Sequence, residues 1–261
     1  MTATIPNTPI TDEHAAQRTY SKWQIYLGLF GFGLGILMGL LQAMERIGVD
    51  LYDTFQLQSY YQGLTLHGVS LALVFTFTFA NGFLTLTTMR GYERPMVATV
   101  LVKASFYLAA GGVALAAAAM LLNKATVLYT FYSPMEAHSI FYIGAVLLVL
   151  STWATMLNML LTLRVWRAEN PGERIPLLSY VSLFTFLMWS IASLGIAIEV
   201  LVFILPWSLG LVEGTDPLLN RTLFWFTGHP IVYFWLLPAY ISWYMMVPKQ
   251  VGGRLYSDGV V

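Results

Sequence analysis

The 261-residue sequence contains no cysteine. This absence excludes disulfides, thiolate zinc sites and iron–sulfur clusters within the chain, so any bound metal must be held by other side chains. Charge is also scarce, because charged residues make up 10% of the chain against about 25% in soluble domains. Basic and acidic residues number 13 each, and this balance gives no reason to expect a nucleic-acid partner or an acidic substrate.

Hydrophobic residues, at 57% of the chain, are typical of an integral membrane protein. Crossing the hydrocarbon takes about 20 mostly apolar residues. Windows of that length lie between Lys22 and Glu45, Asp53 and Arg90, Arg94 and Lys124, Glu136 and Arg164, Arg174 and about Pro206, and Arg221 and Lys249. Long apolar runs disfavour the short alternating strands of a membrane barrel. The sequence therefore predicts an all-α bundle of six transmembrane helices.

Residues 1–22 are polar and include two acids, unlike a cleaved signal peptide, and are predicted to be a retained tail before the membrane region 23–261. Lysine and arginine gather on one side of the predicted spans. That side carries Arg18, Lys22, Arg90, Arg94, Arg164, Arg167, Arg174, Lys249 and Arg254, whereas the other carries Arg46, Lys124 and Arg221. Both termini are therefore expected on the cytoplasmic side of the cell membrane.

Lys103 lies inside the third window and has two interpretations. Its long side chain could snorkel to the interface, or it could be a proton relay.

His67 and His229 are the histidines that fall well inside predicted spans. At the rise of an α-helix, each lies roughly 12 Å from the outer end of its helix, so they share one depth. Neutral imidazole is a common ligand of copper and heme iron. The alternative for each is a histidine hydrogen-bonded across helices.

Three tyrosines share a predicted helix face with His229. At about 100° per residue, Tyr233, Tyr240 and Tyr244 fall roughly 40°, 20° and 60° from it. Such a stripe could relay protons inward to a metal, or it could be packing with an interfacial anchor. A kink at Pro238 would disturb the phase.

Glu199 is the acid that falls clearly within a span, about two turns from its outer end. An intramembrane carboxylate is a functional candidate by default. The alternative is a protonated acid hydrogen-bonded to a neighbouring helix.

In the first window, Gly31, Gly35 and Gly39 recur every four residues, which predicts a close helix contact.

Two stretches resemble subunit I of the heme-copper oxygen reductases, most closely the B-type cytochrome c oxidases. They are TGHPIVYFWLLPAY (227–240) and SYYQGLTLHGVSLALVFT (59–76), and the similarity continues through NKATVLYTFY (123–132) and PKQVGGRLYSD (248–258). Ile231 stands where A-type enzymes commonly carry glutamate. Nitric oxide reductases and C-type oxidases are not expected to carry a tyrosine at the position of Tyr233.

The resemblance implies the subunit I fold with a low-spin heme, a high-spin heme and copper. It assigns His67 as an axial ligand of the low-spin heme and His229 as a copper ligand. It further implies that Tyr233 is joined covalently to His229 and acts in catalysis.

The same resemblance implies an inward proton path through Tyr233, Tyr240 and Tyr244, with Glu199 as a further candidate. Tyr129 and Trp225 match residues along the oxygen approach; by position alone, Tyr129 is instead a residue of the interfacial aromatic belt.

The implied activity is that of a terminal respiratory oxidase, an enzyme that reduces oxygen to water and translocates protons. Electrons would come from cytochrome c through a copper-bearing subunit II. Family members have at least twelve spans and six cofactor histidines, so the chain is expected to be an N-terminal half, inactive until the remaining half of subunit I joins it. Two alternatives stay open: a nitric oxide reductase relative, or a non-catalytic membrane protein that keeps the fold.

Overall fold

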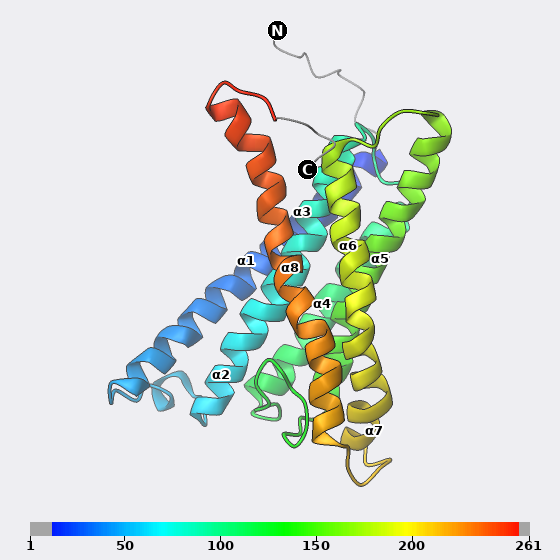
Figure 1. The fold of residues 1–261 in the computed structure, drawn as a ribbon. Helices are drawn as coiled ribbons and strands as arrows, with labels where there is room; N and C mark the ends of the chain where they lie inside the picture. Colours follow the sequence, from blue (N-terminus) through cyan, green and yellow to red (C-terminus); the bar gives the residue numbers. More distant parts are fainter. Residues whose placement is uncertain (1–11, 256–261) are drawn as a thin grey trace.

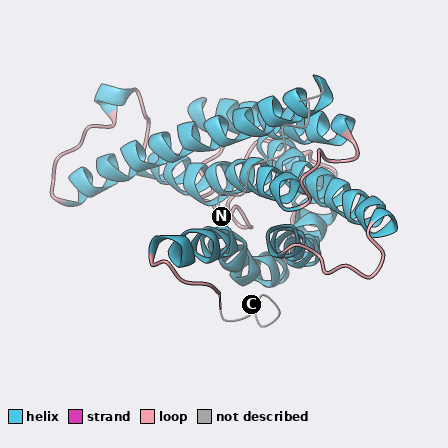
Figure 2. Cartoon of the chain, turned by 90° about the horizontal axis from the view of Figure 1, so that it is seen from above, coloured by secondary structure: helices cyan, strands magenta, loops and turns pink. Residues whose placement is uncertain are grey.

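The computed structural model describes residues 12–255, and within them helices are the regular elements (Figure 2). Six helical stretches are long and apolar enough to cross a membrane: Asp12–Arg46, Tyr60–Gly91, Thr99–Leu121, Ser139–Glu169, Leu177–Ser208 and Pro217–Gln250. Consecutive spans run in opposite directions, so the connecting loops alternate between the two ends of the bundle (Figure 1). The predicted all-α bundle of six spans is confirmed.

In the described part of the chain, four of the six spans are single α-helices, and the other two contain a π-helical turn. The single helices are α1 (Asp12–Arg46), α4 (Thr99–Leu121), α5 (Ser139–Glu169) and α8 (Pro217–Gln250). The second span consists of α2 (Tyr60–Val69), the π-helical turn η2 (Ser70–Phe75) and α3 (Thr76–Gly91). The fifth consists of α6 (Leu177–Ile198), the π-helical turn η3 (Glu199–Ile204) and α7 (Leu205–Ser208), and a 3₁₀ turn, η1 (Asp53–Phe55), precedes α2. Such π-helical turns are rare and occur frequently at functional sites.

The first helix begins before the window that the sequence indicates, because α1 includes residues 12–22. Hydrogen bonds of Gln17 attach this early part of the helix to the loop before α4. The Gln17 side chain is fully buried, donates from Nε2 to the carbonyl of Met96 (2.9 Å) and accepts at Oε1 from the Met96 N–H (2.8 Å). Asn158 on α5 makes the same pair of bonds with Ala98. These two amides hold the loop between α3 and α4 against α1 and α5.

The glycine strip of α1 makes a close helix contact, as the sequence predicts, and its partner is the second span. A Cβ added to Gly31 would lie 2.8 Å from a side-chain carbon of that span, and one added to Gly35 would lie 2.5 Å from another. Contacts this close exclude any larger residue unless the neighbouring side chains or the helices move. Gly39 instead faces the imidazole of His67.

An aromatic cluster joins α3, α6 and α8 at the centre of the bundle. The ring centroid of Trp189 lies 4.8 Å from that of Phe77 and 5.0 Å from that of Phe234, and all three side chains are buried. The indole Nε1 of Trp189 donates to Thr152 Oγ1 on α5 at 2.8 Å, which satisfies its one polar group. The cluster thereby determines which face of α8 turns toward the bundle.

Lys103 lies at the exposed surface of α4, and its Nζ is 5.8 Å from the ring centroid of Tyr20 on α1. Cations favour the faces of aromatic rings at this separation. The contact supports the interpretation of Lys103 as a snorkelling side chain.

Gly112 on α4 and Gly144 on α5 generate a prediction about helix packing. A Cβ on Gly112 would lie 2.6 Å from the Gly144 carbonyl oxygen, and one on Gly144 would lie 2.7 Å from the Gly112 oxygen. We expect Gly112→Ala to separate the helices and lower the free energy of unfolding by about 1–3 kcal/mol, measured by SDS titration in mixed micelles. Gly111→Ala is the control, because its Cβ would meet only a leucine methyl at 3.9 Å. Equal losses in both variants would contradict the proposed contact.

Candidate metal-binding and proton-transfer site

Helix α8 turns one face to the bundle and leaves another uncovered. The buried residues are Asn220, Phe224, Thr227, Gly228, Ile231, Phe234, Pro238 and Ile241. The exposed residues include the candidates Trp225, His229, Tyr233 and Tyr244, with Tyr233 at 49% and Tyr244 at 37% exposure. Within the described chain, these functional candidates are therefore not enclosed by the other five spans.

Thr227 fixes α8 two residues before His229. Its hydroxyl donates to the Ala192 carbonyl (2.7 Å) and accepts from the Ile196 N–H (3.0 Å). In a regular α-helix these two backbone groups pair with each other. The hydroxyl is thus inserted into the hydrogen-bond ladder of α6 just before the π-helical turn η3.

His229 and Tyr233 form a pair on the uncovered face of α8. The His229 Nε2 lies 2.9 Å from the Tyr233 hydroxyl oxygen, and the two rings meet edge to face with centroids 4.8 Å apart. Residues four apart are neighbours on a helix surface, so this pairing follows from the local sequence. Because Nε2 is engaged by the phenol, Nδ1 is the ring nitrogen left for a metal. The covalent link implied by the resemblance stays a prediction.

Tyr129 and Trp225 both pack against Phe224. The Phe224 ring centroid lies 6.3 Å from that of Tyr129 and 5.4 Å from that of Trp225. A Cβ on Gly228 would lie 2.5 Å from Trp225 Cε3, so the glycine leaves room for the indole beside His229. The two predicted oxygen-path residues are thereby brought into one aromatic group.

His67, on α2, packs against α1. Its Nδ1 lies 2.7 Å from the Gly35 carbonyl oxygen. A carbonyl can only accept, so Nδ1 carries the hydrogen and Nε2 of the neutral ring keeps a lone pair for a metal. A Cβ added to the next residue, Gly68, would lie 3.0 Å from the Cβ of Tyr129. The Tyr129 loop therefore contacts both the second span and α8.

Tyr240 and Tyr244 form the part of the tyrosine stripe toward the C-terminal end of α8. Tyr240 is partly buried and packs on Trp243, with ring centroids 5.3 Å apart. Tyr244 lines a pocket of about 300 Å³ between α3, α6 and α8, together with Arg90. Within residues 12–255 no hydrogen bond joins Tyr240 or Tyr244 to Tyr233, so the stripe is a shared face and not a direct hydrogen-bond chain.

Glu199 begins the π-helical turn η3 and is fully buried. Neither carboxyl oxygen has a hydrogen-bond partner among the described residues. The alternative of a purely structural Glu199 requires a hydrogen bond to a neighbouring helix. No such bond is seen within residues 12–255. The structure of this part of the chain also shows no contact that links Glu199 to the tyrosines of α8.

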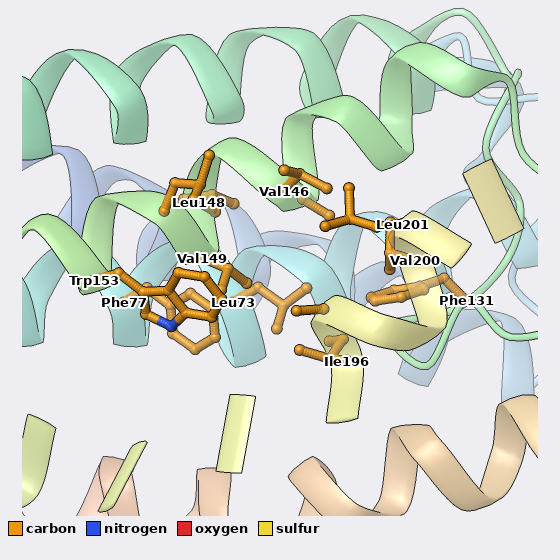
Figure 3. A pocket seen from close by; sticks show the side chains of 13 residues that line it. Leu73, Phe77, Phe131, Val146, Leu148, Val149, Trp153, Ile196, Val200 and Leu201 are labelled. Carbon is orange, nitrogen blue, oxygen red and sulfur yellow. The ribbon is translucent and has the colours of Figure 1, made fainter. Parts of the chain in front are cut away.

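An apolar cavity of about 40 Å³ lies between the second span, α5 and the fifth span (Figure 3). Its walls include Phe77, Phe131, Trp153, Ile196 and Val200. The volume is sufficient for one small molecule, and apolar walls of this kind disfavour water. Phe131 also packs on Phe224, with ring centroids 5.6 Å apart, so the cavity adjoins the aromatic group that holds Tyr129.

Metal ligands are incomplete in the described part of the chain. Across residues 12–255, no three histidine, aspartate or glutamate side chains gather as a metal-binding group. His67 and His229 each offer one ring nitrogen, and imidazole suits both heme iron and copper. Each therefore fits one position of a site that needs further ligands.

Comparison with known proteins identifies the family. Residues 19–261 match the family described as cytochrome c and quinol oxidase polypeptide I. The chain belongs to this family. Cytochrome c oxidase subunit 1 of Thermus thermophilus is 49% identical over 240 residues, which cover 90% of this chain and 42% of that protein. The heme-copper oxidase subunit I+III of Aeropyrum pernix is 28% identical and is matched over 76% of this chain and 26% of its own length.

A solved structure agrees with this membership. One chain of a heme-copper terminal oxidase dimer, determined by cryo-electron microscopy, matches with a TM-score of 0.82 and 39% identity over 88% of this chain and 39% of that chain. The predicted resemblance and fold are confirmed. The chain spans less than half the length of these relatives.

Sequence patterns did not reveal three features of the site. They are the inserted hydroxyl of Thr227, the acceptor that Gly35 provides for His67, and the apolar cavity. The glycine spacing in α1 was a usable signal for a close helix contact. It did not indicate that the approaching group would be an imidazole.

The inserted hydroxyl predicts that Thr227→Val destabilises the junction of α6 and α8. The valine keeps the side-chain shape but leaves the Ile196 N–H and Ala192 carbonyl without the hydroxyl between them. We expect the free energy of unfolding to fall by about 1–3 kcal/mol in SDS titration. Thr222→Val is the matched control, because Thr222 is exposed and bonds only to Leu218 of its own helix, and its effect should stay within about 0.5 kcal/mol. A Thr227→Val variant as stable as this control would contradict the role of the insertion.

Proposed function

We propose that this chain is part of the catalytic subunit of a terminal respiratory oxidase, which reduces oxygen to water with electrons from cytochrome c and translocates protons. The observation that carries the proposal is the His229–Tyr233 pair on the uncovered face of α8, in a chain of the cytochrome c and quinol oxidase family. The relatives are named as cytochrome c oxidase and heme-copper oxidase, which favours oxygen over nitric oxide as the substrate.

Two histidines would hold cofactors. Nε2 of His67 would bind the iron of a low-spin heme, since Nδ1 is engaged by Gly35. Nδ1 of His229 would bind copper, since Nε2 is engaged by Tyr233. When bound, the low-spin heme, the high-spin heme and copper supply electron transfer and oxygen binding.

Tyr233 would deliver a proton at the metal site. Its phenol is held 2.9 Å from the His229 imidazole, and a covalent link would keep it there permanently. Trp225 and Tyr129 would border the approach of oxygen, and the apolar cavity behind Phe131 offers a volume suited to a nonpolar gas.

Tyr240 and Tyr244 would carry protons toward Tyr233 from the opposite end of α8. Tyr244 lines an open pocket near that end, beside Arg90, which gives solvent a route to the phenol. Participation of Glu199 stays a prediction, because no described contact connects it with this face.

The membrane setting is that of a multi-pass protein, and we assign both termini to the cytoplasmic side of the cell membrane. Helix α1 begins and α8 ends at the same end of the bundle (Figure 1). Arginine and lysine are concentrated in the segments at this end, a bias typical of cytoplasmic loops. The uncovered face of α8 would pack on the remaining half of subunit I. A copper-bearing subunit II would pass electrons from cytochrome c. A colourless purified complex would instead support a non-catalytic protein that keeps the fold.

The assignment of His229 predicts that His229→Ala removes copper and retains the low-spin heme. Loss of the imidazole removes a copper ligand and leaves His67 in place. Metal analysis and the visible spectrum of the purified complex measure both cofactors. His67→Ala is the reciprocal variant and should lose the low-spin heme while keeping copper. Normal copper content in His229→Ala would refute the copper assignment.

The assignment of Tyr244 predicts that Tyr244→Phe slows oxygen consumption by about a hundredfold, the lower end of the range for loss of a group that transfers a proton. Both hemes should remain, because the variant removes no ligand. Tyr180→Phe is a suitable control, since Tyr180 is 40% exposed near the same end of the neighbouring helix α6. Unchanged turnover in Tyr244→Phe would remove this residue from the proton path.

A further inference from the structure

We propose that Gly35 and Gly39 of α1 form a seat for the His67 imidazole, which sets the tautomer and orientation of this heme ligand. The seat consists of the Gly35 carbonyl oxygen and the space left by the absent side chain of Gly39. Both residues are positioning residues that act through His67. The inference rests on the proposed function for the identity of the bound group, and on the described contacts for its geometry.

The Gly35 carbonyl determines the tautomer. It lies 2.7 Å from His67 Nδ1, a short distance for a hydrogen bond between nitrogen and oxygen. A carbonyl oxygen has two lone pairs, so it can accept this bond in addition to the backbone bond of its own helix. With the hydrogen held at Nδ1, Nε2 of the neutral ring is the nitrogen that can bind iron.

Gly39 determines where the ring lies. A Cβ at this position would come within 2.9 Å of both Cε1 and Nδ1 of His67, whereas Nε2 would be 3.9 Å away. Helix α1 therefore contacts the ring along its Nδ1–Cε1 edge. Any side chain at residue 39 would push this edge away from α1, and the ring would lose the Gly35 acceptor.

The rest of the glycine strip has a different partner. Gly31, one turn before Gly35, meets the aliphatic side chain of Val74, with an added Cβ 2.8 Å from Cγ1. Gly31 and Gly39 thus provide equally close helix contacts, but only Gly39 contacts the imidazole. This difference separates a role in helix packing from a role in positioning the ligand.

Holding the imidazole by its second nitrogen has a consequence for the bound heme. A hydrogen bond from Nδ1–H to an acceptor raises the basicity of the ligating nitrogen and fixes the ring plane. A more basic ligand stabilises ferric over ferrous iron. The seat should therefore lower the midpoint potential of the low-spin heme.

The test compares Gly39→Ala with Gly31→Ala in the complete purified oxidase. We expect Gly39→Ala to shift the g-values of the low-spin ferric heme in electron paramagnetic resonance. We also expect the midpoint potential to rise by about 59 mV, which corresponds to a tenfold change in relative ferric and ferrous affinity. Gly31→Ala disturbs the same helix contact and should leave both properties unchanged. Gly33→Ala, whose added Cβ would meet nothing within 4 Å, controls for the substitution itself.

A measurement on the unaltered complex tests the hydrogen bond without any variant. With ¹⁵N-labelled histidine and reduced low-spin heme, the axial imidazole of His67 should show a slowly exchanging Nδ1–H. A rapidly exchanging Nδ1–H, or equal heme shifts in Gly39→Ala and Gly31→Ala, would overturn the seat. Retention of the low-spin heme in His67→Ala would instead overturn the assignment of His67, so the two failures are distinguishable.

Discussion

Lipid offers no hydrogen bonds, so a polar group inside the membrane is satisfied only by a partner within the protein. In this bundle the partners commonly come from another span. Asn81 of α3 donates to Ser151 of α5, and Trp189 of α6 donates to Thr152 of α5. Thr227 of α8 enters the backbone ladder of α6. These bonds satisfy polar groups and also fix the relative positions of the helices.

The same requirement connects packing with chemistry at His67. An imidazole inside a membrane needs a partner for its N–H, and the Gly35 carbonyl provides it. A backbone carbonyl of one helix becomes reachable for a side chain of another only when the helices approach closely. The glycine strip of α1 permits that approach, so one structural device serves both the fold and the candidate heme ligand.

Helix α8 shows how the core orients groups that lie outside it. Phe234 is enclosed by Trp189 and Phe77, which turns its neighbour Tyr233 toward the uncovered face. His229 and Tyr233 are thus presented together at a surface that the described chain does not cover. A heme-copper centre assembled there would need ligands beyond those that residues 12–255 gather. The chain spans less than half the length of its relatives.

Local patterns in the sequence were enough to determine the six spans and to place His229 and Tyr233 on one helix face. Hydrophobic windows and residues four apart depend only on helix geometry, which is the same wherever the helix lies. The tertiary structure decided which atoms meet across helices: the bonds of Gln17 in the early part of α1, the acceptor for His67, the contacts of the Thr227 hydroxyl with α6 and the apolar cavity. These features join residues far apart in the chain, and the position of one helix against another depends on all the side chains between them.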